Sequence, residues 1–235
     1  ISGKRVIAAM LTALMAVTFT ANTAVSVYAT GVTATENAQT IDAQSTDAQA
    51  LTPEEQKAQE LQQVYDMPVE SNGYKDWPQG PGTYGEAGIV MEVGTGAILY
   101  AKNIDAHEYP ASITKVLTAL VALENGQLTD NVTFSHDSVA FLQRGDSSVG
   151  LKEGNVITLD QAMHAMLLAS ANEAAYAIGE SVGVNAGHDY NWFIEQMNSR
   201  CKELGGENSN FANTNGLHDP NHYTCARDMA LIGRE

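Results

Sequence analysis

Short apolar runs and longer helical repeats alternate along the chain, and they divide most of it into successive elements. Two short apolar runs, residues 87–93 and 97–101, flank a Gly-Thr-Gly segment, which is the pattern of a β-hairpin. A longer apolar run opens at Pro110 and stops at Asn125-Gly126, which predicts a helix over residues 110–124. Residues 132–134 have the composition of a short strand.

The second half of the chain has helical periodicity. One predicted helix is capped by Thr158 or Asp160, and another follows the sequence Ser170-Ala171-Asn172. A third is expected over residues 186–204, and a last one begins near Thr224, after an irregular stretch at residues 211–217. Strands that precede a block of helices indicate an α+β fold.

The first residues have the pattern of an export signal. Lys4 and Arg5 precede an apolar stretch at residues 6–19, and small residues follow it up to a possible cleavage site after Ala29. The apolar stretch is shorter than the roughly 20 residues of a membrane span. We therefore expect a signal peptide over residues 1–29 and an exported protein of the cell envelope, with a buried N-terminal helix as the alternative. Because the chain opens on Ile1 and not on methionine, a few leading residues are expected to be missing.

Residues 30–83 are expected to be a spacer that precedes the folded domain. Residues 30–50 are rich in Ala, Thr, Gln, Asp and Ser without a hydrophobic period, which is typical of a disordered linker. Thr52, Pro53 and Glu55 then form a capping-box pattern that predicts a short helix up to about Tyr65. A loop rich in Gly and Pro at residues 76–82 ends the spacer, so the folded domain is expected over residues 84–235.

The net charge of the chain argues against two classes of binding partner. Its 12 Lys and Arg against 28 Asp and Glu give a formal net charge of −16. Nucleic-acid binding would need a basic patch, and an anionic membrane would need a polybasic segment, so neither partner is expected. The two cysteines, Cys201 and Cys225, could form a disulfide in an exported protein, but two buried free thiols are at least as compatible with the sequence.

Ser112 and Lys115 are the first candidates for chemistry, because they stand three residues apart where the apolar helix begins. Residues at this spacing share one helix face, so the amine would lie beside the hydroxyl. A neutral lysine could then take the serine proton and make the oxygen a nucleophile. Pro110 suits the first helical turn, where free backbone N–H groups could stabilise an oxyanion. By itself, however, this spacing also occurs by chance, with the serine near a helix start and the lysine in solvent.

Ser170 and Asn172 are the second pair of candidates, at the joint between two predicted helices. A hydroxyl there could pass a proton between a base and a leaving group. The amide offers two donors and one acceptor, which suits a peptide backbone or a lysine amine. The alternative is that both residues only cap the following helix.

Taken together, these segments resemble a known family. Several segments occur in the order found in D-alanyl-D-alanine carboxypeptidases. They are Ser112-x-x-Lys115 within Pro-Ala-Ser-Ile-Thr-Lys, Ser170-Ala171-Asn172, and residues 100–103, 167–175, 215–219 and 223–228. These carboxypeptidases are the low-molecular-mass penicillin-binding proteins of serine peptidase family S11. The resemblance covers residue 84 to the end, and it implies a β-lactamase/transpeptidase-like fold, in which an antiparallel sheet carries a helical subdomain.

The resemblance also implies a role for each candidate residue. Ser112 would attack the carbonyl between the two terminal D-alanines of a peptidoglycan stem peptide, and Lys115 would accept its proton. Ser170 would relay a proton to the departing D-alanine, and Asn172 would hold the substrate amide and the lysine amine. Water would hydrolyse the acyl-enzyme, β-lactams would acylate Ser112 as covalent inhibitors, and no metal or cofactor would take part.

The family's third motif, Lys-Thr-Gly or Lys-Ser-Gly, does not occur in this sequence. In the family it lies on a strand that binds the substrate carboxylate and supplies an oxyanion N–H. We therefore expect a C-terminally truncated chain that lacks the last strands of the sheet and does not turn over as given. Membrane association would be possible only through the missing C-terminal region.

Two other functions remain open from the sequence. A class A β-lactamase shares the first two motifs but needs a Glu-x-x-x-Asn segment, which is absent here, and Ala171 stands where such enzymes carry aspartate. A non-catalytic cell-wall protein that kept the fold is the other. His218 and His222 have the i, i+4 spacing of a zinc site, but Pro220 between them favours a loop.

Overall fold

The computed structural model describes residues 51–235. The predicted signal peptide and the predicted disordered part of the spacer, residues 30–50, lie outside the described residues. The chain divides into two compact units. Of the described residues, 51–66 and 83–85 belong to the first unit, and 67–82 and 86–235 to the second.

The described part of the first unit contains the helix α2 (Pro53–Tyr65). Its predicted capping box is confirmed, because the Glu55 N–H donates to Thr52 Oγ1 at 3.3 Å and the Thr52 N–H donates to the Glu55 carboxylate at 2.8 Å. No side chain of α2 is buried, and the Tyr65 ring lies 4.9 Å from that of Tyr84. The caps and this aromatic contact thus account for a helix that has no core of its own.

The second unit begins with a short 3₁₀ helix, η1 (Glu70–Gly73), and the predicted hairpin, β1 (Gly88–Met91) and β2 (Ile98–Lys102). The two strands pair antiparallel, with an irregularity between Val90 and Met91. The Trp77 indole N–H donates to the carbonyl of Leu99 at 2.8 Å, which ties the preceding loop to β2. The Gly-Thr-Gly turn therefore joins two strands, as the alternation predicts.

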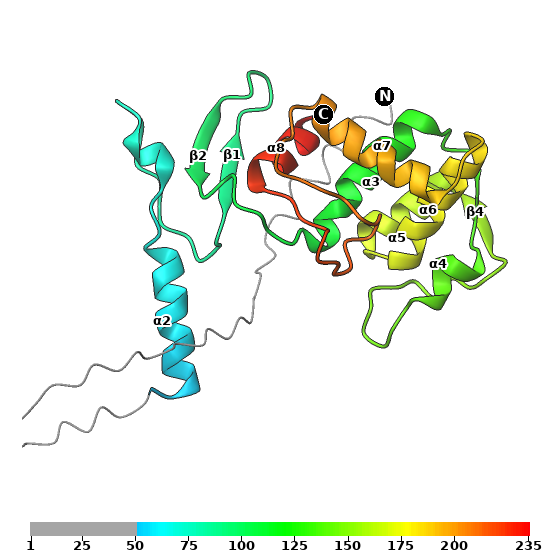
Figure 1. The fold of residues 1–235 in the computed structure, drawn as a ribbon, viewed down its shortest axis with the longest axis horizontal. Coiled ribbons are helices and arrows are strands. Elements are labelled where there is room, and N and C mark those ends of the chain that lie inside the picture. The colour runs from blue at the N-terminus through cyan, green and yellow to red at the C-terminus, as the bar shows by residue number, and fades with distance from the viewer. Residues whose placement is uncertain (1–50) are drawn as a thin grey trace, which may run out of the picture. The chain divides into compact units, whose positions relative to one another are not determined.

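Helices form most of the second unit (Figure 1). The helix α3 (Thr114–Asn125) packs against α5 (Leu159–Leu168), α6 (Asn172–Asn185) and α7 (Tyr190–Glu203). A two-stranded antiparallel sheet, β3 (Asn131–Thr133) and β4 (Val156–Thr158), lies against α6, and α4 (His136–Ala140) and α8 (Ala226–Arg234) complete the unit. Apolar side chains of these helices form one core, which includes Leu117, Val121, Met163, Met166, Ile178, Phe193 and Met197.

Two helix starts differ from the prediction. The helix expected from Pro110 begins only at Thr114, because Ala111 has a φ of +48° and the chain first forms the 3₁₀ turn η2 (Ala111–Ile113). The helix expected from residue 186 begins at Tyr190, because Gly187 has a φ of +84° and Asp189 caps the new helix by accepting the Trp192 N–H. In both cases a left-handed residue interrupts the helical path.

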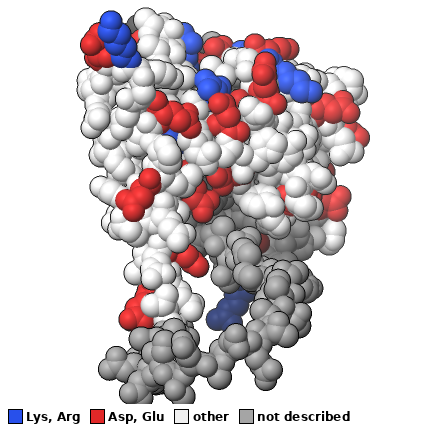
Figure 2. Space-filling model, turned by 60° about the vertical axis from the view of Figure 1, so that its left-hand side comes forward, with Lys and Arg blue, Asp and Glu red and all other residues white. Residues whose placement is uncertain are grey.

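The observed mixture of helices and antiparallel strands is the predicted α+β class. Cys201 and Cys225 are both buried free thiols, and burial raises the pKa of each to about 11, so both stay protonated at neutral pH. Acidic side chains are spread over the face shown in Figure 2, interspersed with Lys and Arg. Within residues 51–235, no helix is both long enough and apolar enough to cross a membrane.

Candidate active site

Ser112 is the middle residue of the η2 turn, which ends where α3 begins, and its side chain is exposed. The preceding residue, Ala111, has the left-handed backbone that only a few non-glycine residues adopt. Gly216 packs directly on this turn, and a Cβ on Gly216 would overlap the carbonyl oxygen of Ala111. The strained turn that carries Ser112 is therefore held by a residue about one hundred positions later.

Replacement of Gly216 by alanine should lower the free energy of unfolding by roughly 2–5 kcal/mol, because both the φ of +83° and the overlap oppose a side chain there. Gly154→Ala is the matched control, since Gly154 has a φ of +82° but open space around it, and should cost about 1–2 kcal/mol. Denaturant unfolding of both variants measures the difference. Equal losses would mean that the contact with Ala111 does not hold the turn.

Lys115 lies one turn into the helical segment, with only 2% of its surface exposed. Its amine donates to three oxygens: Ser112 Oγ at 3.1 Å, Asn172 Oδ1 at 2.8 Å and the backbone carbonyl of Asn215 at 2.7 Å. The structure thus brings the two residues of the first motif together, and it buries the lysine instead of placing it in solvent.

The environment of Lys115 makes its neutral form accessible. Burial lowers the pKa of the amine to about 8, and the charge of Glu173 opposes this effect in part. Removing an ammonium from water disfavours its charged form, which is the cause of the shift. At neutral pH a measurable fraction of Lys115 is therefore unprotonated and can accept a proton.

Ser170 and Asn172 reach the same place from the joint between α5 and α6. Ser170 has a φ of +54°, and its hydroxyl donates to Ser112 Oγ at 2.9 Å. Asn172 is buried and accepts the Lys115 amine through its side-chain oxygen. All four residues singled out in the sequence therefore belong to one hydrogen-bond network that includes Ser112 Oγ. Two of the three acceptors of the Lys115 amine, the oxygens of Asn172 and Asn215, come from later segments of the chain.

His222 fixes the first turn of α3 from the other side, a contact that the sequence does not indicate. The Ala212 N–H donates to its Nδ1 at 3.1 Å, so the proton of the neutral ring is on Nε2, which donates to Thr114 Oγ1 at 2.8 Å. Burial lowers the pKa of His222 to about 4, so the ring is neutral at physiological pH.

His218 and His222, the pair with the spacing of a zinc site, make other contacts in the structure. Both ring nitrogens of His222 are hydrogen-bonded, and His218 packs its exposed ring edge-to-face on Tyr109, with centroids 4.7 Å apart. Pro220 and its neighbours form a loop, as expected. Within the described residues, no three His, Cys, Asp or Glu side chains gather in a way that could hold a metal ion.

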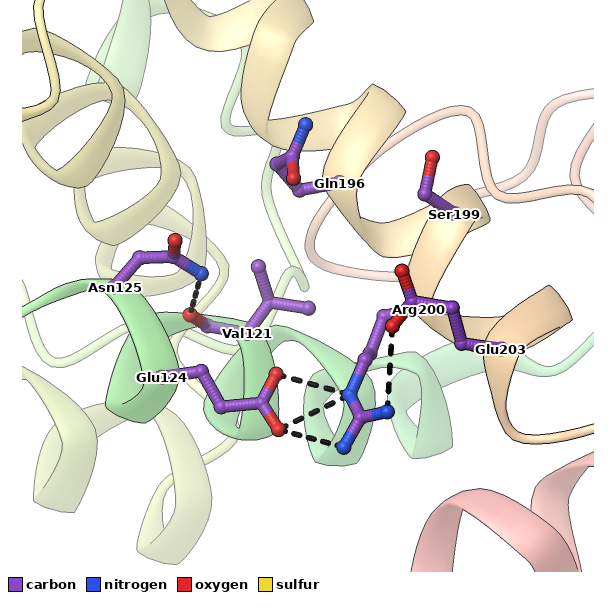
Figure 3. A pocket seen from close by; sticks show the side chains of 7 residues that line it. All are labelled: Val121, Glu124, Asn125, Gln196, Ser199, Arg200 and Glu203. Carbon is purple, nitrogen blue, oxygen red and sulfur yellow. Dashed lines mark hydrogen bonds and ion pairs between the residues drawn. The ribbon is translucent and has the colours of Figure 1, made fainter.

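A surface hollow of about 280 Å³ lies at the other end of α3 (Figure 3). Arg200 of α7 crosses it to reach Glu124 of α3, at 2.9 Å. Glu124 is roughly 14 Å from Lys115 along the helix axis, at about 1.5 Å per residue. This hollow is lined by an ion pair, and none of its lining residues belongs to the Ser112 cluster.

A family model for D-alanyl-D-alanine carboxypeptidases, peptidase family S11, matches residues 78–235. The chain belongs to this family. D-alanyl-D-alanine carboxypeptidase DacA of Haemophilus influenzae is 35% identical over 150 residues, which cover 62% of this chain and 37% of the relative. DacF of Bacillus subtilis is 33% identical over 155 residues, which cover 64% of this chain and 38% of the relative. The chain thus spans less than two fifths of the length of these two relatives.

Two solved structures share the fold. The D-alanyl-D-alanine carboxypeptidase DacD from Francisella tularensis aligns with a TM-score of 0.56 at 32% identity, over 63% of this chain and 35% of that one. The Streptomyces K15 DD-transpeptidase aligns with a TM-score of 0.57 at 29% identity, over 62% and 58%. The β-lactamase/transpeptidase-like fold implied by the sequence is confirmed.

Proposed function

We propose that the protein is a serine D-Ala-D-Ala carboxypeptidase that removes the terminal D-alanine from peptidoglycan stem peptides. The observation that supports this most is the convergence of a buried amine and a second hydroxyl on Ser112 Oγ, within a chain of the S11 family. Acyl transfer needs a nucleophile, a base that takes its proton and a donor for the leaving group. Ser112, Lys115 and Ser170 are of the right type for these three tasks.

The contacts of Lys115 suggest how it acts as the base. A neutral amine has two N–H donors and one lone pair. The side-chain oxygen of Asn172 and the backbone carbonyl oxygen of Asn215 can accept a hydrogen bond but cannot donate one. When these two acceptors take both N–H groups, the lone pair is left for the Ser112 hydroxyl, 3.1 Å away. The serine oxygen then forms a bond to the substrate carbonyl carbon while its proton passes to Lys115.

Ser170 is placed to serve the leaving group. Its hydroxyl lies 2.9 Å from Ser112 Oγ and can donate a proton to the amine nitrogen of the departing D-alanine as the C–N bond breaks. Lys115 then gives up the serine proton to replace the one that Ser170 donated, so the amine is neutral again. A water molecule attacks the acyl-enzyme ester while Lys115 takes one of its protons, and this proton passes to Ser112 Oγ as the ester C–O bond breaks. The cycle returns Ser112 to its free form and needs no change of oxidation state.

The same mechanism has consequences for inhibitors and location. A β-lactam carbonyl would acylate Ser112 in place of the peptide, giving an ester at the same oxygen. The substrate is part of the cell wall, so the enzyme would act outside the cytoplasm, in the cell envelope, after export by the predicted signal peptide. Neither a cofactor nor a metal is required by this chemistry.

Labelling of the full-length protein with a fluorescent penicillin tests the proposal. We expect one covalent label on wild type and none on Ser112→Ala, with Ser199→Ala as the control, because Ser199 is an exposed serine on α7. The wild type should also release D-alanine from a peptide that ends in D-Ala-D-Ala. Label that survives Ser112→Ala would contradict the assignment of the nucleophile. Rapid penicillin hydrolysis with the peptide left intact would favour a β-lactamase. The absence of both reactions would favour a non-catalytic cell-wall protein.

A further inference from the structure

Glu173 is a buried carboxyl next to the candidate site, and the mechanism above gives it no task. It follows Asn172 in the first turn of α6, and none of its surface is exposed. One oxygen, Oε1, accepts three hydrogen bonds: from Ser148 Oγ at 2.7 Å, from the Val149 N–H at 2.8 Å and from the Gly150 N–H at 3.2 Å. The other oxygen, Oε2, is buried and has no hydrogen-bond partner.

These bonds tie a loop to the second motif. The Asn172 N–H donates to the carbonyl of Ser147 at 2.9 Å, directly before the three donors to Glu173. Residues 147–150 are therefore held by four hydrogen bonds to two consecutive residues, Asn172 and Glu173. The backbone of Asn172, whose side chain accepts the Lys115 amine, is positioned in part by this loop.

A buried carboxylate must be compensated by charge or by hydrogen bonds. The loop N–H groups and the amino-terminal end of α6 supply part of this compensation. Lys115 supplies another part, because the charge of Glu173 acts on its amine.

Several charged groups on the elements packed around α3 contact one another, away from Lys115. On α7, Arg200 pairs with Glu124 at the far end of α3, and also with Glu203 and Glu235. On α5, His164 and Asp160 lie in solvent beside each other. His222, beside Thr114, is neutral. Glu173 is the charge that acts on the Lys115 amine.

We propose that Glu173 is a positioning residue for acylation, which stabilises the proton on Lys115 after it leaves Ser112 and anchors the 147–150 loop beside Asn172. This inference rests on the proposed function. It assigns Glu173 no contact with the substrate, because its carboxylate is enclosed by its own loop. Its effect is exerted through the basicity of Lys115 and the place of Asn172.

Removing the charge of Glu173 should have two opposite effects on the rate. Because the carboxylate raises the pKa of Lys115, Glu173→Gln should lower that pKa, and a larger fraction of the lysine is then neutral below pH 8. The same change makes Lys115 a weaker base, so the maximal acylation rate should fall. A residue that only held the loop would lower the rate equally at every pH.

The test is the pH profile of the second-order acylation rate constant, measured on the full-length protein with a labelled penicillin. For Glu173→Gln we expect the acidic limb, the pH range in which the rate constant rises, to move to lower pH and the plateau to fall several-fold. Glu180→Gln is the matched control, because it removes one charge from the same helix at a residue bonded to Ser135, and its limb should match the wild type. A Glu173→Gln limb that coincides with that of the wild type would overturn the proposal.

Glu173→Asp keeps the test decisive if the glutamine variant does not fold. It retains the charge, so its acidic limb should stay with the wild type while its plateau falls because the loop contacts lengthen. An acidic limb displaced to lower pH with the charge retained would overturn the proposal. Failure of the wild type to be acylated at Ser112 would instead reject the proposed function, so the two failures are distinguishable.

Discussion

Replacement of Lys115 by methionine is expected to lower the acylation rate constant of Ser112 by at least about 10³-fold, because the serine loses the base that is hydrogen-bonded to it. Methionine has a similar length and suits a site that is 2% exposed, so the fold should be retained. Stopped-flow or gel-based labelling with a fluorescent penicillin measures the rate, and circular dichroism checks the fold. In the wild type, the rate should rise with pH up to about pH 8, where Lys115 becomes mainly neutral.

Lys115→Arg distinguishes a base from a simple cation. Arginine keeps the positive charge but stays protonated at every accessible pH, so it cannot accept the serine proton. We expect this variant to be as slow as Lys115→Met. An arginine variant that kept a tenth or more of the wild-type rate would show that Lys115 contributes charge alone.

Ser170→Ala should lower the turnover of a D-Ala-D-Ala peptide by roughly 10²–10⁴-fold, the range typical of a lost proton donor. The expected cause is slower departure of D-alanine, because the hydroxyl 2.9 Å from Ser112 Oγ is gone. Lys115 keeps its other contacts in this variant, so its buried environment and lowered pKa should remain. Release of D-alanine and the acylation rate should be measured on the same preparation.

A thiol at the same position is a sensitive check of the proton-relay role. Ser170→Cys preserves the size of the side chain but replaces the hydroxyl with a weak donor. We expect an activity between those of wild type and Ser170→Ala. If both variants turned over the peptide within twofold of the wild type, Ser170 would be a helix-joint residue without a part in proton transfer.

The sequence was sufficient to predict which side chains meet. Ser112 and Lys115 share a helix face by spacing, and Ser170 and Asn172 stand at a helix joint, which explains why both pairs could be singled out. Their convergence depends on α3 packing against α6, and only the resemblance to a family indicated it in advance. The hairpin follows from its two apolar runs around a Gly-Thr-Gly turn, and most helices follow from their apolar periodicity.

The missed features depend on contacts between distant segments. The left-handed backbone of Ala111 has no signal in its own residue type, because the turn is held by Gly216. The Asn215 contact to Lys115 uses a backbone carbonyl, which every residue has. Glu173, in the first turn of a helix, has the sequence pattern of a solvent-exposed residue that favours the helix dipole, but in the structure it is buried and bound by the distant 147–150 loop.

The carbonyl of Asn215 determines when during folding the candidate site can become reactive. It is joined to Lys115 across one hundred residues of sequence, so the amine is buried and oriented only after α3, α6 and this late segment have come together. Such long-range closure is slow compared with the formation of single helices. A chain that is still unfolded would carry an ordinary serine and an ordinary charged lysine. Reactivity at Ser112 would then arise with the native fold itself, and penicillin labelling would count correctly folded molecules.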